Sequence, residues 1–171
     1  MNTKNNKRRR ESMQKMEREF VNMLLERDVS EITVSDICKA ADVNRSTFYA
    51  NYQDIYDLVE KICLNMQNEF NAAFEGEIDE GFGALKMFTH IYENQLFYKI
   101  YFLLEKYSRE KVMVYDKIRA ERDFGNQNVD YHIEFFRSGF NAIVKMWLDR
   151  GCKESPEEMA KILESEYMGR K

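Results

Sequence analysis

Proline, glycine, histidine and cysteine are all scarce in this sequence, and each shortage excludes a class of protein. One proline and seven glycines provide too few turn signals for a protein built of many strands. The two histidines and the odd set of three cysteines lack metal-ligand spacing, so neither a zinc site nor a disulfide framework is expected. Such cysteines fit reduced thiols in a cytoplasmic protein.

Long apolar runs and catalytic motifs are also missing. No stretch of about 18 apolar residues is present, which argues against a membrane-spanning helix. The first residues lack the apolar segment of a signal peptide. There is no glycine-rich phosphate loop, no nucleophile motif and no carboxylate pair beside a histidine. We therefore expect no enzyme, no cofactor, no metal and no membrane partner.

The residues that are plentiful favour helices. Leu, Met, Glu, Lys and Ala are all good helix formers, and 44% hydrophobic residues in a chain of 171 can build a core. We therefore predict an all-α protein. Apolar residues recur at helical spacing, which predicts helices at about 11–27, 34–41, 45–51, 54–75, 81–94, 95–107, 109–122, 129–150 and 156–168.

The net charge of −4 is unevenly distributed. Residues 1–53 hold ten Lys and Arg against eight Asp and Glu, a net charge of +2, whereas residues 54–171 hold sixteen against twenty-two, a net charge of −6. The basic excess lies mostly in the first ten residues. Such an arm is either a disordered, solvated tail or a segment that binds phosphate.

Two short predicted helices, at about 34–41 and 45–51, are joined by the four residues "ADVN". This is the plan of a helix-turn-helix, whose second helix enters the DNA major groove, although a plain helical hairpin has the same pattern. In the second helix Phe48 can pack inward while Arg45 bonds bidentately to guanine. The hydroxyls of Thr47 and Tyr49 suit phosphate oxygens. The predicted DNA-binding residues are Thr33, Ser35, Lys39, Asn44, Arg45, Ser46, Thr47, Tyr49, Asn51 and Tyr52.

The segment "ITVSDICKAADVNRSTFYANYQDIYDLVEKI" resembles the DNA-binding segment of the tetracycline-repressor (TetR/AcrR) family. The resemblance covers about residues 13–62 and rests on Thr33, Ile37, Cys38, Ala41, Val43, Thr47, Phe48, Tyr49, Tyr52 and Leu58. Two positions depart from the family pattern. Asp42 replaces the usual glycine of the turn, but Asp tolerates left-handed backbone better than most residues. Ile55 stands where a phosphate-contacting lysine is common, and the basic arm is the alternative source of that contact.

The resemblance implies a helix-turn-helix DNA-binding domain at 1–53 and a larger helical domain at 54–171 for dimerisation and effector binding. It also implies a homodimer on a palindromic DNA operator, most often acting as a repressor. The segment "WLDRGCKESPEEMAKIL" is similar to C-terminal domains of a TetR-like subgroup found mainly in Gram-positive bacteria. Some members of that subgroup activate transcription with a partner protein. The alternative function is therefore a protein of this fold that binds a protein partner, with weak or no DNA binding.

The C-terminal half carries two further sets of candidate residues. Its many aromatic residues predict either a pocket for a small-molecule effector or an ordinary core, and the pocket candidates are Phe88, Tyr92, Tyr98, Tyr101, Phe102, Met113, Tyr131 and Phe135. A glycine inside the predicted helix 129–150 costs about 1 kcal/mol relative to alanine, which indicates a close approach of another backbone. By resemblance to the four-helix dimer bundle of the family, the interface candidates are Gly139, Ile143, Trp147, Met159 and Leu163, with packing inside one chain as the alternative.

Overall fold

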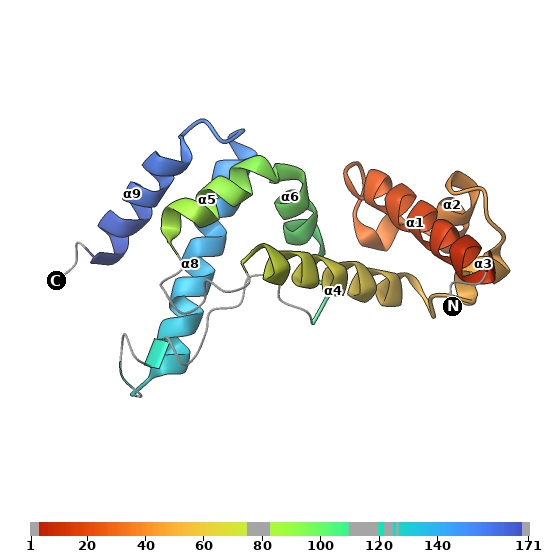
Figure 1. The fold of residues 1–171 in the computed structure, drawn as a ribbon, viewed down its shortest axis with the longest axis horizontal. Coiled ribbons are helices and arrows are strands. Elements are labelled where there is room, and N and C mark those ends of the chain that lie inside the picture. The colour runs from red at the N-terminus through yellow and green to blue at the C-terminus, as the bar shows by residue number, and fades with distance from the viewer. Residues whose placement is uncertain (1–3, 75–82, 110–119, 122–124, 126, 169–171) are drawn as a thin grey trace. The chain divides into compact units, whose positions relative to one another are not determined.

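The computed structural model of the chain (Figure 1) describes residues 4–74, 83–109, 120–121, 125 and 127–168. Every regular element within these ranges is helical, which confirms the predicted all-α fold. The elements are α1 (Lys4–Leu24), the 3-10 turn η1 (Val29–Glu31), α2 (Val34–Ala40), α3 (Arg45–Tyr49), α4 (Ile55–Ala73), α5 (Ala84–Glu93), α6 (Gln95–Leu104), α8 (Val129–Asp149) and α9 (Pro156–Met168). Almost all of the helix predicted at about 109–122 lies outside the described residues. None of the described helices is both long and apolar enough to cross a membrane.

The chain divides into two compact units. The first consists of Met1–Glu69 and Ile100–Val112, and the second of Phe70–Lys99 and Met113–Lys171. Most of α4 therefore belongs to the same unit as the three N-terminal helices. The functional boundary after residue 53 remains a prediction.

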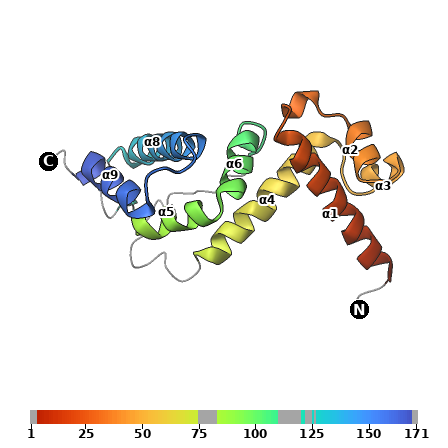
Figure 2. The ribbon, with the colours of Figure 1, turned by 90° about the horizontal axis from the view of Figure 1, so that it is seen from above.

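The helices α1, α2 and α3 pack against one another in the first unit (Figure 2). Met16 and Phe20 of α1, Ile37 of α2 and Phe48 of α3 are all 0% exposed. Because α3 has only five residues, it cannot be stable as an isolated helix. Its position depends on Phe48, since removing a buried phenylalanine ring typically costs about 3–5 kcal/mol.

Helix α1 begins earlier than its apolar pattern indicates. The predicted start was about residue 11, but the helix starts at Lys4, so the basic arm forms its first two turns. Arginine and lysine are good helix formers, and Lys7 pairs with Glu11 one turn later at 3.9 Å. The arm therefore presents its guanidinium groups from a helix rather than from a disordered tail.

Two capping boxes fix the path of the chain between α1 and α2. The Asp28 side chain accepts from the Ser30 backbone N–H while the Glu31 carboxylate accepts from the Asp28 N–H. At the start of α2 the Asp36 carboxylate accepts from the Thr33 N–H, and the Thr33 hydroxyl accepts from the Asp36 N–H. Caps of this kind typically stabilise by about 1 kcal/mol each, so the entry to α2 is locally determined.

The second unit is built around Trp147 of α8, which is 1% exposed. Its ring lies edge-on to Phe88 of α5, with centroids 5.5 Å apart, and its indole Nε1 donates to the Glu154 carbonyl at 3.1 Å. Helix α9 packs against α5. The tryptophan thus joins α8 both to α5 and to the loop before α9.

Helix α8 ends in a left-handed turn at Gly151, which has a φ of 76°. The Gly151 N–H donates to the Leu148 carbonyl at 3.1 Å, and the Cys152 N–H donates to the Trp147 carbonyl at 2.9 Å. These two bonds make a Schellman motif. Pro156 then opens α9 behind a capping box between Ser155 and Glu158.

Candidate nucleic-acid interface

The turn between α2 and α3 adopts the geometry that a helix-turn-helix requires. Asp42 has a φ of 54°, the left-handed conformation expected for this position. The Val43 N–H donates to the Cys38 carbonyl at 3.0 Å, and this bond closes the end of α2. Asn44 occupies the N-cap position of α3, but its side chain makes no capping hydrogen bond. The aspartate thus performs the role of the family's usual glycine.

The outer face of α3 brings three predicted DNA-binding residues together. The Arg45 guanidinium donates to the Ser35 hydroxyl at 3.2 Å and to the Tyr49 hydroxyl at 3.4 Å. All three side chains are exposed, and Tyr49 is 52% exposed although its neighbour Phe48 is fully buried. A long basic side chain and a phenol are thus presented side by side from adjacent turns.

Four other predicted residues surround this outer face. Ser46 is exposed, and Thr47 is half-buried where α3 faces α1. Lys39 and Asn44 are exposed and line a polar hollow of about 540 Å³ together with Ser12 of α1. The hollow lies beside Thr47, so the polar surface continues from α3 to the end of α2.

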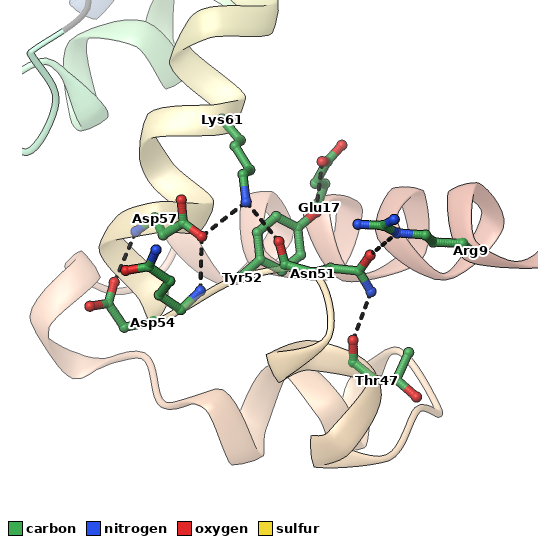
Figure 3. A network of polar contacts seen from close by, with 9 residues as sticks. Arg9, Glu17, Thr47, Asn51, Tyr52, Asp54, Asp57 and Lys61 are labelled. Carbon is green, nitrogen blue, oxygen red and sulfur yellow. Dashed lines mark hydrogen bonds and ion pairs between the residues drawn. The ribbon is translucent and has the colours of Figure 1, made fainter. Parts of the chain in front are cut away.

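Two predicted DNA-binding residues, Asn51 and Tyr52, do not face outward (Figure 3). Asn51 is 9% exposed and donates through Nδ2 to the Thr47 carbonyl at 2.7 Å. Tyr52 is 1% exposed, and its hydroxyl donates to the Glu17 carboxylate at 2.9 Å. Burial and the adjacent Glu17 carboxylate raise the pKa of Tyr52 far above its usual value. The expectation that Asn51 faces out was wrong, because α3 ends at Tyr49 and the chain turns inward.

Thr33 is occupied by its capping role. Its hydroxyl donates to the Asp36 carboxylate at 2.7 Å and accepts from the Asp36 N–H at 3.1 Å. The hydrogen bond from Thr33 lowers the pKa of Asp36, which keeps this carboxylate ionised. An anionic carboxylate beside Thr33 opposes the predicted phosphate contact there, and Arg27 offsets it only from 3.9 Å.

A polar network joins the end of α3 to α1 and α4 (Figure 3). The Arg9 Nε donates to the Asn51 Oδ1 at 2.7 Å, and the Lys61 Nζ donates to the Asn51 carbonyl at 2.7 Å and to the Asp57 carboxylate at 2.9 Å. The Lys61 ammonium also lies 4.9 Å from the centre of the Tyr52 ring. From the sequence, Arg9 was expected only as part of the basic arm, and Lys61 was not expected in this region. The only local sequence pattern that indicates part of this network is the spacing of four residues between Asp57 and Lys61, which favours an ion pair on one helix face.

The described members of the predicted effector-pocket set are divided between the two units. Phe88 and Tyr98 are buried in the second unit, where the Tyr98 hydroxyl lies 2.7 Å from the His90 Nδ1. Tyr101 and Phe102 are buried in the first unit. Tyr92 is 46% exposed and stacks on Trp147, whereas Tyr131 and Phe135 are 79% and 75% exposed. Met113 lies outside the described residues. The effector pocket remains a prediction, and the exposed residues argue against this particular lining.

The predicted interface residues also separate into two kinds. Trp147, Met159 and Leu163 are buried within their own unit, at 1%, 4% and 9% exposure. This burial favours the stated alternative of packing inside one chain, and it leaves these three side chains little surface for a contact with another copy. Ile143 is half-buried and Gly139 is exposed on α8.

The comparisons with known proteins agree with this architecture. The model of a TetR-type family described as "Transcriptional regulator C-terminal region" matches residues 82–166, about half of the chain. No curated protein matches the sequence. The match lies C-terminal to the helix-turn-helix whose residues resemble the same family, so both parts of the chain lead to one assignment. The chain belongs to the TetR family of transcriptional regulators.

Proposed function

We propose that the protein is a homodimeric repressor that binds a palindromic DNA operator through α3. The observation that carries this proposal is the exposed pair Arg45 and Tyr49 on a short helix held from below by Phe48. The major groove is about 12 Å wide and admits one helix. Two copies of α3 would occupy successive major-groove faces about 34–36 Å apart. A dimer seated there would exclude other proteins from the same DNA.

The side chains have different roles in this complex. Arg45 reads a guanine through two parallel N–H donors, whose loss costs about 1–3 kcal/mol of discrimination. Tyr49 and Thr47 donate hydroxyls to backbone phosphates, which positions the helix without reading sequence. The Ser35 hydroxyl holds the Arg45 guanidinium at 3.2 Å, so part of its orientation is set before DNA arrives.

A stripe on α8 supports the homodimer. Tyr131, Phe135, Gly139, Ala142 and Met146 are all exposed, and their spacing of four, four, three and four places them on one face of the helix. A methyl group added at Gly139 would meet nothing within 4 Å in its own chain. The glycine therefore leaves room for a second helix, and we assign this face, here called the α8 stripe, to the twofold contact in place of Trp147, Met159 and Leu163.

DNA binding is tested by titrating the full chain onto duplexes from its own upstream region and onto an unrelated duplex at several salt concentrations. The proposal predicts operator affinity in the nanomolar range that falls steeply with salt. Arg45→Ala should weaken the operator by about 1–3 kcal/mol and leave the unrelated duplex unchanged. Tyr49→Ala, the matched variant on the same helix face, should weaken both duplexes alike. Absence of duplex binding would favour the alternative of a protein-binding member of the fold.

The dimer contact is tested with Phe135→Glu. A buried phenylalanine contributes about 1.5–3 kcal/mol on leaving water, and a carboxylate on each side of a twofold contact adds repulsion. We expect sedimentation equilibrium to show a dimer for the wild type and a monomer for the variant. Leu85→Glu is the matched control, because Leu85 is 46% exposed on α5 and lies outside the α8 stripe. A dimeric Phe135→Glu variant would refute the assignment of this face.

A further inference from the structure

A second hollow opens between the start of α1 and α3, and its lining suits an anion. It has a volume of about 330 Å³. Its lining consists of Arg8, Arg9, Ser12, Ser46, Thr47, Ala50 and Asn51. The lining residues bring two guanidinium groups, three hydroxyls and one amide but no carboxylate, and of the hydroxyls that of Ser12 already donates to the Arg8 carbonyl at 3.0 Å. Guanidinium groups with hydroxyl donors are the combination that proteins use for phosphate oxygens.

Arg9 is oriented toward this hollow before any ligand arrives. Its Nε donates to the Asn51 Oδ1 at 2.7 Å, and the Asn51 Nδ2 in turn donates to the Thr47 carbonyl at 2.7 Å (Figure 3). Within the described ranges, the two Nη atoms of Arg9 have no hydrogen-bond partner. The Asn51 amide thus fixes the inner edge of the guanidinium and leaves its outer edge to donate two parallel N–H bonds.

The charges near α3 favour a phosphate contact at α1 over one at α4. The start of α4 carries the carboxylate of Asp57 in its first turn and that of Asp54 just before it. The Lys61 ammonium nearby is already bonded to Asp57 and to the Asn51 carbonyl. A DNA backbone that passes α3 therefore meets negative charge at α4 and positive charge at α1.

We propose that the hollow between α1 and α3 is a seat for one DNA backbone phosphate in each half-site, held by Arg8 and Arg9 with a hydroxyl of Ser46 or Thr47. The proposal rests on the proposed function, because it takes the ligand to be duplex DNA entered by α3. It adds that the basic arm is a sequence-independent anchor with a defined phosphate partner, not a diffuse source of positive charge.

The test compares Arg8→Gln and Arg9→Gln with the matched control Arg10→Gln. All three remove one charge from neighbouring positions of α1, but Arg10 does not line the hollow. Losing one phosphate contact in each half-site should reduce the slope of log K against log salt by about 1.8 for the dimer. The ratio of wild-type affinity to the affinity of Arg8→Gln or Arg9→Gln should then fall about 12-fold between 50 and 200 mM salt. The fall should be equal on the operator and on the unrelated duplex. Arg10→Gln should change the slope much less.

A duplex with a single ethylated phosphate locates the seat directly. Ethylation neutralises one phosphate, and at the seat it should weaken the wild type and Arg10→Gln but have little effect on Arg8→Gln. If the wild type binds its operator but all three variants have equal salt slopes, the phosphate seat is refuted and the proposed function still stands. A wild type that binds no duplex would overturn both. Arg8→Gln keeps the test valid if Arg9→Gln loosens α3, because no described hydrogen bond holds the Arg8 guanidinium.

Discussion

Asn51→Ala tests whether the residue that sequence analysis placed on the DNA-facing surface is instead a structural junction. The substitution removes two side-chain hydrogen bonds at once, the one to the Thr47 carbonyl and the one from Arg9. The backbone carbonyl of residue 51 is kept, so the bond from Lys61 survives. Any change therefore reports on the amide side chain alone.

The magnitude follows from the two bonds. The neutral bond from the Asn51 Nδ2 to the Thr47 carbonyl contributes about 0.5–1.5 kcal/mol net. The bond from Arg9 involves a charged donor, but the guanidinium is exposed and screened by water, so we assign it about 0.5–1 kcal/mol. The sum of about 1–2.5 kcal/mol corresponds to a fall in Tm of about 2–10 °C for a chain of this size.

Urea denaturation followed by far-UV circular dichroism measures this loss. Asn44→Ala is the matched control, since Asn44 is exposed and its side chain caps nothing, and its free energy of unfolding should change by no more than about 0.5 kcal/mol. If Asn51→Ala lost no more than Asn44→Ala, the junction would not be energetically important. DNA affinity should also fall, because Arg9 would lose its orientation.

Three further substitutions test other parts of the fold. The hydrogen bond from the Tyr107 hydroxyl, followed by those from Ser30 and Lys106, holds the pKa of Asp28 well below its usual value. The ionised carboxylate therefore stabilises the fold at neutral pH, and this contribution is lost as the pH falls below about 4. Tyr107→Phe should reduce the decline in stability between pH 5 and 2, measured by urea denaturation, and an unchanged decline would refute this. Gly151→Ala forces a side chain into a φ of 76° and should cost about 1 kcal/mol, whereas Gly139→Ala, with open space around it, should stabilise the monomer and weaken the dimer in sedimentation. These expectations would be contradicted if Gly151→Ala were as stable as the wild type, or if Gly139→Ala dimerised as strongly as the wild type.

The sequence predicted the local features of the helix-turn-helix well. It indicated that Phe48 is buried, that Tyr49 is exposed and that Asp42 turns the chain, and the structure agrees on all three. Each of these depends on the residue itself and its nearest neighbours, through helical spacing or tolerance of left-handed backbone. Local patterns are sufficient for such features.

The features that the sequence did not predict depend on contacts between distant positions. Arg9 and Asn51 are 42 residues apart, and Tyr52 and Glu17 are 35 apart, so no periodic pattern connects them. Asn51 was expected to face outward because the helix was predicted to run to residue 51, whereas α3 ends at Tyr49. Trp147 was named an interface candidate by resemblance to the family's dimer bundle, and the sequence could not correct this because apolar residues on a long helix look alike whether they meet their own chain or another copy.

The junction at Asn51 has a consequence for how binding energy is distributed. A flexible side chain that becomes fixed on binding typically costs about 0.5–1.5 kcal/mol in lost rotamers. Arg9 has already lost part of this freedom in the free protein through its hydrogen bond to Asn51. The Arg8 guanidinium, in contrast, makes no hydrogen bond to the residues that the structure describes. Both arginines carry the same charge, so the salt slopes of their Gln variants should match. If the proposed seat binds a phosphate, the operator affinity should fall further for Arg9→Gln than for Arg8→Gln, because only Arg9 would bind from an orientation that folding has already set.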